Sequence, residues 1–175
     1  ALALVCGDAI VWKPSPKTPL TALAVQALFE RAVRRYNAAG GAAPEGLSAL
    51  LHGDRAVGEA LVESPLVPLV SATGSTAMGR SVGPRLAARF ARAILELGGN
   101  NAAIVAPSAD LDLTLRAIAF AAMGTAGQRC TTLRRLIVQD GIYEPFVPRL
   151  VAAYAPVPVG EPLAEGTLIG PLIDK

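Results

Sequence analysis

The amino-acid sequence predicts an α/β protein built on a largely parallel sheet. Short apolar runs, each about the length of one strand, alternate with segments whose apolar residues recur every three or four positions, as on one face of a helix. Hydrophobic residues make up 52% of the 175 residues, which is enough for a real core. Strands and helices that take turns along a chain are typical of parallel α/β architecture.

Residues 1–62 are expected to contain two strands and two helices. A strand at 9–12 is closed by Lys13-Pro14-Ser15-Pro16, where two prolines disfavour a helix. Thr18-Pro19 then offers a cap and a first-turn proline for a helix that runs to about Tyr36. The other elements expected here are a strand at 47–51 and a short helix at 55–62.

The rest of the chain repeats this alternation, and two of its helices show a clear apolar face. The residues of these faces are Met78, Val82, Leu86 and Phe90 in the first helix, and Leu111, Leu115, Ile118, Ala119 and Ala122 in the second, which Asp110 opens. Pro148 obscures the start of a last helix, expected around 146–154. The strands expected here are 67–71, 93–97, 102–106 and 133–138.

Composition excludes several classes of function. The net charge is only +2 and the cationic residues are mostly arginines scattered singly, so a nucleic-acid partner is not indicated. No apolar run is long enough to cross a bilayer, and no secretory leader is recognisable. Cys6 and Cys130 lie far apart and outside any CxxC or His-rich cluster, which predicts neither a metal site nor a disulfide framework. We therefore expect a cytoplasmic protein. Because the chain opens inside an apolar run without an initiator Met, we also expect an internal piece of a longer one.

The stretch Gly124-Thr125-Ala126-Gly127-Gln128-Arg129-Cys130-Thr131-Thr132 carries the most chemical information. A free cysteine is most often a small buried hydrophobic residue, and we interpret Cys6 in this way. Around Cys130, however, two glycines let the backbone bend sharply and leave room beside the sulfur. Arg129 places a cation next to it, which favours the reactive thiolate. Cys130 is therefore a candidate nucleophile.

Glu96 is a carboxylate at the end of an otherwise apolar strand, within Glu96-Leu97-Gly98-Gly99-Asn100-Asn101. Desolvation at such a position disfavours the charged form, which is the property of a useful general base. The alternative is a carboxylate that merely reaches solvent past the strand end. The paired glycines favour the first interpretation, because they open the strand end to a ligand.

Two weaker signals point to a nucleotide. Thr73-Gly74-Ser75-Thr76 stands between a strand and a helix, where first-turn amides attract phosphate and a Ser hydroxyl can add a hydrogen bond. Ser and Thr also cap helices without any functional role, and the GxGxxG pattern is absent. Lys13, just past a strand, could contact a ribose or could be an ordinary exposed lysine. The sequence around His52, the only histidine, does not indicate a catalytic triad.

Four motifs, taken in order, resemble the aldehyde dehydrogenase superfamily. They are Val11-Trp12-Lys13-Pro14-Ser15, Thr73-Gly74-Ser75-Thr76, Glu96-Leu97-Gly98-Gly99-Asn100 and Gly127-Gln128-Arg129-Cys130, and the match continues to Val159-Gly160-Glu161-Pro162 and Gly170-Pro171-Leu172. Asn100-Asn101 and the residues around Cys130 look like one branch in particular, the α-aminoadipic semialdehyde (piperideine-6-carboxylate) dehydrogenases of lysine breakdown.

The resemblance implies NAD(P)-dependent oxidation of an aldehyde, α-aminoadipic semialdehyde in that branch, to a carboxylate. Cys130 matches the nucleophile that forms a thiohemiacetal and then a thioester. Glu96 matches the base that activates water to hydrolyse the thioester. Arg129 matches a residue that helps to hold the polar end of the amino-acid semialdehyde, where a guanidinium suits a carboxylate.

The resemblance also implies a dinucleotide cofactor, NAD with NADP not excluded. The residues assigned to it are Lys13, with Ser15 in the same motif, at the adenosine ribose; Gly74 and Ser75 at the helix start under the pyrophosphate; and Leu97 and Gly98 beside the nicotinamide. Many NAD-using members have Glu three residues after the ribose lysine. This chain has Pro16 there, which leaves the choice between NAD and NADP open.

The fold implied is a partial Rossmann-like coenzyme domain at 1–98 and the start of a second α/β catalytic domain at 99–175, with the active site between them. The family's oxyanion-hole Asn should precede Ala1 and a second ribose-binding Glu should follow Lys175, so we expect the piece alone to be feebly active at most. The parent protein is expected to be a homo-oligomer that acts on a small-molecule aldehyde, without a nucleic-acid or membrane partner. Two alternatives remain: a nucleotide-binding module of this fold without chemistry, and a cysteine acyltransferase that uses no nicotinamide.

Overall fold

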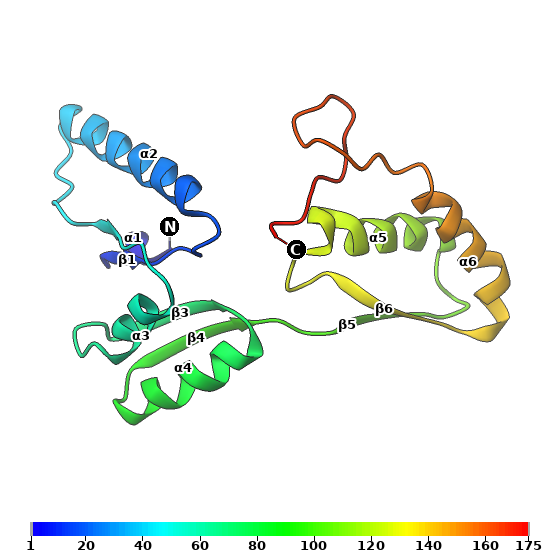
Figure 1. Cartoon of the computed structure of the whole chain (residues 1–175), viewed down its shortest axis with the longest axis horizontal. Helices are drawn as coiled ribbons and strands as arrows, with labels where there is room; N and C mark the ends of the chain where they lie inside the picture. The colour runs from blue at the N-terminus through cyan, green and yellow to red at the C-terminus, as the bar shows by residue number, and fades with distance from the viewer. Residues whose placement is uncertain (1, 175) are drawn as a thin grey trace. The chain divides into compact units, whose positions relative to one another are not determined.

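The computed structural model of the chain describes residues 2–174, in which helices and strands alternate (Figure 1). In chain order they are α1 (Leu2–Val5), β1 (Ile10–Trp12), α2 (Pro19–Ala38), β2 (Ser48–Leu50), α3 (Arg55–Glu63), β3 (Leu69–Gly74), α4 (Thr76–Ala88), β4 (Arg92–Leu97), β5 (Asn101–Val105), α5 (Leu111–Met123), the 3-10 turn η1 (Gly124–Gly127), β6 (Leu133–Val138) and α6 (Asp140–Tyr154). The predicted α/β class is confirmed.

The described strands pair two by two, β1 with β2, β3 with β4 and β5 with β6. The first and last pairs are parallel. The middle pair is parallel as well, because Arg92 N donates to Pro68 O at 2.9 Å and Gly98 N donates to Gly74 O at 3.1 Å, so the bonds advance along both chains together. A helix connects the two strands of each pair, as a parallel crossover requires.

The chain divides into two compact units, which we describe separately. The first comprises Ala1–Ser71 and Ser81–Ile94, and the second comprises Ala72–Arg80 and Leu95–Lys175. The first unit thus contains α1 to α3, and the second contains β5, α5, η1, β6 and α6. The assignment of a coenzyme function to 1–98 and a catalytic one to 99–175 stays a prediction.

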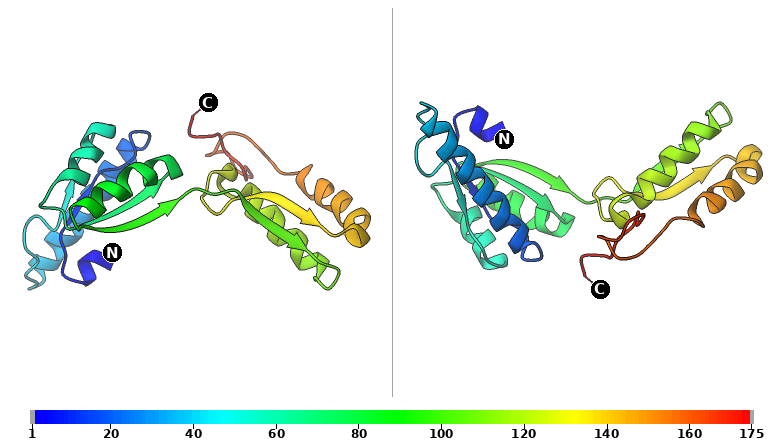
Figure 2. Two further views of the ribbon diagram at one scale, coloured as in Figure 1. Left: turned by 90° about the horizontal axis from the view of Figure 1, so that it is seen from below. Right: turned by 90° about the horizontal axis from the view of Figure 1, so that it is seen from above.

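In the second unit α5 and α6 lie side by side over one face of the β5–β6 pair (Figures 1 and 2). Their core is a cluster of Val105, Ile118 and Phe146, each at most 5% exposed. The predicted inner face of α5 packs against this cluster, and the carboxylate of Asp110 caps the helix by accepting from the amides of Asp112 and Leu113 at 3.0 Å. The apolar residues of the strands and of the helices therefore pack together in one core.

A second contact joins α5 to α6 at the surface. The guanidinium of Arg149 donates a hydrogen bond to the carboxylate of Asp112. This hydrogen bond, more than the accompanying charge attraction, lowers the pKa of Asp112. Because a lowered pKa stabilises the fold only while the carboxylate is ionised, this contribution is present near neutral pH and is lost at acidic pH.

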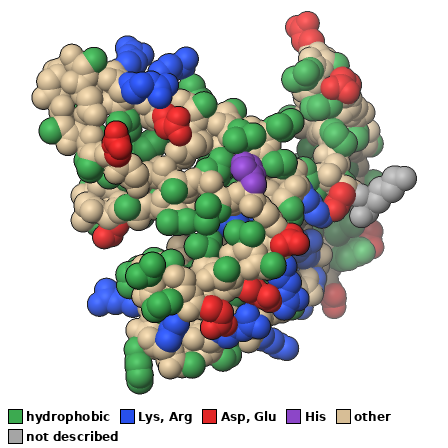
Figure 3. Space-filling view, turned by 60° about the vertical axis from the view of Figure 1, so that its left-hand side comes forward, with side chains coloured by type: hydrophobic (Ala, Val, Ile, Leu, Met, Phe, Trp, Pro, Cys, Tyr) green, Lys and Arg blue, Asp and Glu red, His purple; other side chains and the backbone are tan. Residues whose placement is uncertain are grey.

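The opposite face of the β5–β6 pair exposes two isoleucines beside Ala102 and Arg135. Ile104 and Ile137 are directly paired in the ladder and are 77% and 53% exposed. Figure 3 shows a face of the molecule on which acidic and basic side chains lie among hydrophobic ones.

Among the described helices, none combines the length and the apolar character that a membrane crossing requires.

Three local expectations were wrong. Phe90 does not lie on the apolar face of α4, because the helix ends at Ala88 and Phe90 has a left-handed backbone (φ 57°) and is 97% exposed. Thr18 precedes α2 as expected, but its side chain makes no capping hydrogen bond in the described structure. Helix α6 begins at Asp140, six residues before the expected start, although Pro145 and Pro148 lie inside it. The complete burial of Phe146 between these prolines offsets the backbone hydrogen bonds that they cannot donate.

The core predicts a selective response to Phe146→Ala. We expect a cavity that lowers the opening free energy of the second unit by about 3–5 kcal/mol. Amide hydrogen exchange should therefore become much faster in β5 and β6 and stay unchanged in β1 and β2. Equal acceleration in both units would contradict the assignment of Phe146 to a core of its own.

Candidate active site

Cys130 is exposed and lies in the loop between η1 and β6. The backbone before it bends sharply, as predicted, but the glycines do not make the bend alone. Thr125 and Ala126 adopt left-handed conformations (φ 58° and 53°), followed by Gly127 (φ 71°). Side chains with a Cβ atom adopt this region at an energetic cost, so the surrounding contacts must hold the loop.

A tight turn then encloses Cys130. Thr132 N donates to Arg129 O at 3.2 Å, and Arg129 N donates to the hydroxyl of Thr132 at 3.0 Å. Thr132 is buried, whereas Cys130 and Thr131 are exposed. The turn therefore presents the thiol on its outer side and is closed from within by the threonine hydroxyl.

Asn101, the first residue of β5, holds this turn from outside. Its side-chain amide Nδ2 donates to Cys130 O at 2.7 Å and to Thr132 O at 2.9 Å. Sequence reasoning used Asn101 only as part of a motif and assigned it no role. The signal available was an amide side chain two positions after a glycine pair, which itself follows a strand that carries a carboxylate.

The guanidinium of Arg129 makes its described contacts with the preceding helix and turn. It lies over the ring of Phe120, 5.7 Å from the centroid, and its Nε donates to the hydroxyl of Thr125. A Cβ atom on Gly124 would stand 3.8 Å from the guanidinium carbon, which is ordinary van der Waals contact, so the arginine packs beside this glycine. The predicted role of Arg129 in substrate binding stays a prediction.

Glu96 lies on β4 and is exposed, so the burial expected from its apolar neighbours is not observed. Burial of Cys6 was also wrong, because α1 is only four residues long and buries none of its side chains. From Glu96 the chain reaches Asn101, and hence the backbone of Cys130, in five residues. The expectation that the thiol and this carboxylate share one crevice stays a prediction.

Residues assigned to the cofactor gather at the carboxyl ends of β3 and β4. Gly98 N donates to Gly74 O at 3.1 Å, and a Cβ atom on Gly98 would meet none of the described atoms within 4 Å. Leu97 packs against Gly79 of α4, where an added Cβ would lie 2.5 Å from Leu97 Cδ1. In parallel α/β sheets this end of the strands is where ligands bind.

Ser75 stands at the start of α4 and caps it. Its hydroxyl accepts from Met78 N at 3.1 Å, and its carbonyl accepts from Gly79 N at 3.0 Å. Ser75 therefore does cap the helix, which was one of the two roles that the sequence left open. The hydroxyl hydrogen can still be donated to a ligand, since the capping bond uses only a lone pair.

Lys13 and Ser15 belong to the first unit. Lys13 Nζ donates to Pro14 O at 2.6 Å and to Gly53 O at 3.2 Å, and its side-chain carbons run past Gly58 of α3. Lys13 is therefore a half-buried, fixed side chain and not an ordinary exposed lysine. The hydroxyl of Ser15 accepts from Lys17 N at 3.2 Å and shapes the turn before α2.

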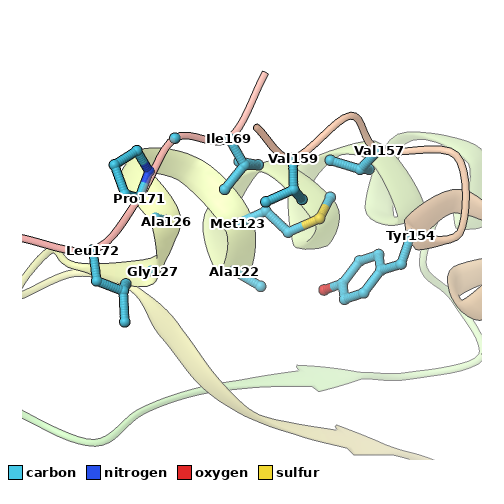
Figure 4. Close-up of a pocket in the computed structure, with 11 residues that line it drawn as sticks. Ala122, Met123, Ala126, Gly127, Tyr154, Val157, Val159, Ile169, Pro171 and Leu172 are labelled. Atoms are coloured by element: carbon cyan, nitrogen blue, oxygen red, sulfur yellow. The ribbon is translucent and has the colours of Figure 1, made fainter. Parts of the chain in front are cut away.

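A cavity of about 550 Å³ lies beside η1 in the second unit (Figure 4). Its walls are largely apolar and come from the end of α5, from η1 and from the segment 157–172, with the hydroxyl of Tyr154 as a polar group. Burial raises the pKa of Tyr154. Gln128 links the residue that follows this segment to the cysteine loop, because Ile173 N donates to Gln128 Oε1 at 2.9 Å. The sequence did not predict the cavity, since segment 157–172 has no periodic pattern.

Within residues 2–174, His, Cys, Asp and Glu side chains do not form a group that could hold a metal ion.

Comparison with known proteins shows the family to which the chain belongs. The model of the aldehyde dehydrogenase family matches residues 1–175. A homologue of aldehyde dehydrogenase family 7 member A1 from Caenorhabditis elegans is 51% identical over 174 residues, which are 98% of this chain and 32% of that protein. The α-aminoadipic semialdehyde dehydrogenase of Bos taurus is 41% identical over 175 residues, which are 100% and 32% of the two chains.

Solved structures agree with this match. An NADP-dependent enzyme of E. coli superposes with a TM-score of 0.89 at 39% identity, covering 98% of this chain and 34% of that one. The glyceraldehyde-3-phosphate dehydrogenase GapN of Methanocaldococcus jannaschii, complexed with NADP, gives 0.88 at 34% identity, covering 98% and 36%. The chain thus spans about a third of the length of the curated relatives it matches.

The cysteine turn predicts different effects for two neighbouring threonines. Thr132→Val keeps the shape of the side chain but leaves Arg129 N without its acceptor, which should cost about 1–3 kcal/mol. We expect faster hydrogen exchange of the backbone amides from Arg129 to Leu133. Thr131→Val, at the exposed neighbour, is the matched control and should leave exchange unchanged. An equal response to both variants would show that the hydroxyl of Thr132 does not hold the turn.

Proposed function

The chain belongs to the aldehyde dehydrogenase family, and on that premise we propose that the full-length protein oxidises a small-molecule aldehyde to a carboxylate with a nicotinamide dinucleotide. The observation that carries the proposal is the cysteine turn. An exposed thiol stands on a backbone that is bonded to the segment following Glu96. A thiol nucleophile and a nearby carboxylate base are the two groups that such an oxidation requires.

In the proposed reaction the thiolate of Cys130 attacks the aldehyde carbon, and the carbonyl oxygen takes up a proton to give a thiohemiacetal. Loss of hydride from that carbon and of the hydroxyl proton leaves a thioester on Cys130. Glu96 then takes a proton from water, whose oxygen attacks the thioester carbon. The C–S bond breaks, and the carboxylate product leaves with the thiolate restored. When bound, the dinucleotide supplies the hydride acceptor.

The described residues fit a dinucleotide in three places. Gly98 leaves open space at the end of β4, where a Cβ atom would otherwise project. Ser75 caps the start of α4, and helix N-termini favour phosphate groups. Lys13 is held with its ammonium group next to one carbonyl group that follows β1 and one that follows β2. Pro16 places no carboxylate opposite a 2′-phosphate, so both NAD and NADP are compatible with this motif.

We further propose an amino-acid semialdehyde as the substrate, with α-aminoadipic semialdehyde as the specific candidate. The α-aminoadipic semialdehyde dehydrogenases of Bos taurus and Rattus norvegicus are 41% and 40% identical to this chain. Arg129, one residue before the nucleophile, is the cation proposed to meet the substrate carboxylate. In this proposal residues 1–98 bind the coenzyme and residues 99–175 carry the catalytic residues. The full-length protein is proposed to be a homo-oligomer.

The covalent mechanism predicts that Cys130→Ala lowers turnover of the full-length protein at least about a thousandfold, because the nucleophile is lost. Turnover is measured as formation of the reduced cofactor. Cys6→Ala is the matched control and should retain turnover. Iodoacetamide should label Cys130 at a rate that changes when NAD or NADP is added.

Three results would contradict this proposal. Normal turnover in Cys130→Ala would exclude the covalent role. Labelling indifferent to either cofactor would favour a nucleotide-binding module without chemistry. Acyl transfer in the absence of a nicotinamide would instead identify a cysteine acyltransferase.

The open space at Gly98 predicts a variant that binds cofactor poorly but folds normally. Gly98→Ala adds a methyl group that touches none of the described atoms yet fills space assigned to the nicotinamide. We expect unchanged thermal unfolding and a cofactor Kd raised by about tenfold or more. Gly141→Ala, at the start of α6, also adds a methyl group in open space and is the control. Equal affinity of the two variants would remove Gly98 from the cofactor site.

A further inference from the structure

We propose that Asn101 is a positioning residue for Cys130, whose side-chain amide fixes the backbone of the turn that carries the thiol. The inference rests on the nucleophilic role proposed above for Cys130. Asn101 touches neither the sulfur nor a reacting atom in the described contacts; its two hydrogen bonds go to the carbonyl groups on either side of Thr131. It therefore acts through Cys130.

The chemistry of this contact requires an amide donor. A carboxamide nitrogen carries two hydrogens, and both are used, one for Cys130 O and one for Thr132 O. The opposite orientation of the amide would bring its oxygen against two carbonyl oxygens, so the acceptors fix the assignment of the nitrogen. Serine at this position is too short to span both carbonyls, and aspartate offers acceptors where donors are needed.

Asn101 takes over where the strand ladder fails. It is paired with Leu133 at the beginning of the β5–β6 ladder, and the ladder has an irregularity between Asn101 and Ala102. At such a bulge the regular backbone donors no longer face their acceptors. The side chain supplies two donors at this point and extends the sheet to the turn that carries Cys130.

A second tether strengthens the arrangement. Arg135 of β6 donates through Nη2 to Asn100 O at 2.7 Å. The segment after Gly99 is thus bonded to the cysteine turn by one side chain and to β6 by another. On its other side the turn is preceded by left-handed Thr125 and Ala126, which are conformations that need support. We infer that loss of the Asn101 amide releases Cys130 while the packed core below stays intact.

The test compares Asn101→Ser with Asn37→Ser in the full-length protein. Asn37 also bonds twice to another segment, since its amide donates to Ala43 O at 3.0 Å and accepts from Ala43 N at 2.8 Å, but it lies in the first unit. Both variants lose a similar pair of hydrogen bonds, and only one of these pairs reaches the cysteine turn. The measurements are kcat and KM for the aldehyde, and the pH profile of Cys130 alkylation followed on the peptide that contains this residue.

Asn101→Ser is expected to lower kcat by about tenfold to a hundredfold, because the nucleophile is no longer held in line, while KM changes by less than about threefold. Asn37→Ser should leave both within about threefold. In Asn101→Asp, which keeps the shape of the side chain, a carboxylate beside the turn should move the alkylation midpoint to higher pH. If Asn101→Ser does not fold, the kcat and midpoint of Asn101→Asp decide the question.

Equal kcat in the two serine variants, or a wild-type kcat and midpoint in Asn101→Asp, would overturn the positioning role. Cys130→Ala, measured in parallel, separates this failure from that of the proposed function. Retained turnover in Cys130→Ala removes the nucleophile itself. Lost turnover in Cys130→Ala, together with a harmless Asn101→Ser, removes only the positioning role.

Discussion

Parallel pairing of β5 with β6 is the constraint on which the second unit depends. A parallel partner can be reached only by a crossover, so the chain leaves β5 at its carboxyl end, passes through α5 and returns to the amino end of the pair. Cys130 stands three residues before the start of β6, and Asn101 opens β5. The crossover therefore brings two residues that are 29 positions apart in sequence to the same end of one ladder, where the amide of Asn101 can reach the carbonyl of Cys130.

Parallel pairing of β3 with β4 likewise brings together residues that we assign to the cofactor, close in sequence to the strand that holds the proposed nucleophile. The carboxyl ends of parallel β3 and β4 gather Gly74 and Gly98, and β4 leads directly into the start of β5. The segment between Leu97 and Asn101 thus runs from a place suited to a nucleotide to the backbone of a thiol. If both proposed assignments hold, one short glycine-containing connection joins the two sites.

Sequence periodicity was sufficient for the order and type of most elements. The inner face of α5 and the strands on either side of it were predicted because their apolar spacing and the cap at Asp110 agree. Prediction failed where tertiary packing outweighs local preference. Pro145 and Pro148 disfavour a helix, yet the buried ring of Phe146 between them keeps α6 helical.

Within the candidate site, the residue types were predictable but their contacts were not. Cys130 and Glu96 were candidates because of their neighbours in sequence. The role of Asn101 could not, because its partners lie across a ladder whose irregularity no sequence pattern indicates. The guanidinium of Arg129 lies over the ring of Phe120, an α5 residue outside the apolar face that the sequence predicted.

The paired isoleucines Ile104 and Ile137 carry one more consequence. Parallel sheets are normally covered on both faces, and this pair leaves an aliphatic stripe in contact with water. Two copies of the chain can shield such stripes from water by stacking them face to face, at a gain of about 25 cal/mol for each Å² removed from solvent. We therefore expect association through these paired isoleucines to lower the solubility of the chain, however well its interior is packed.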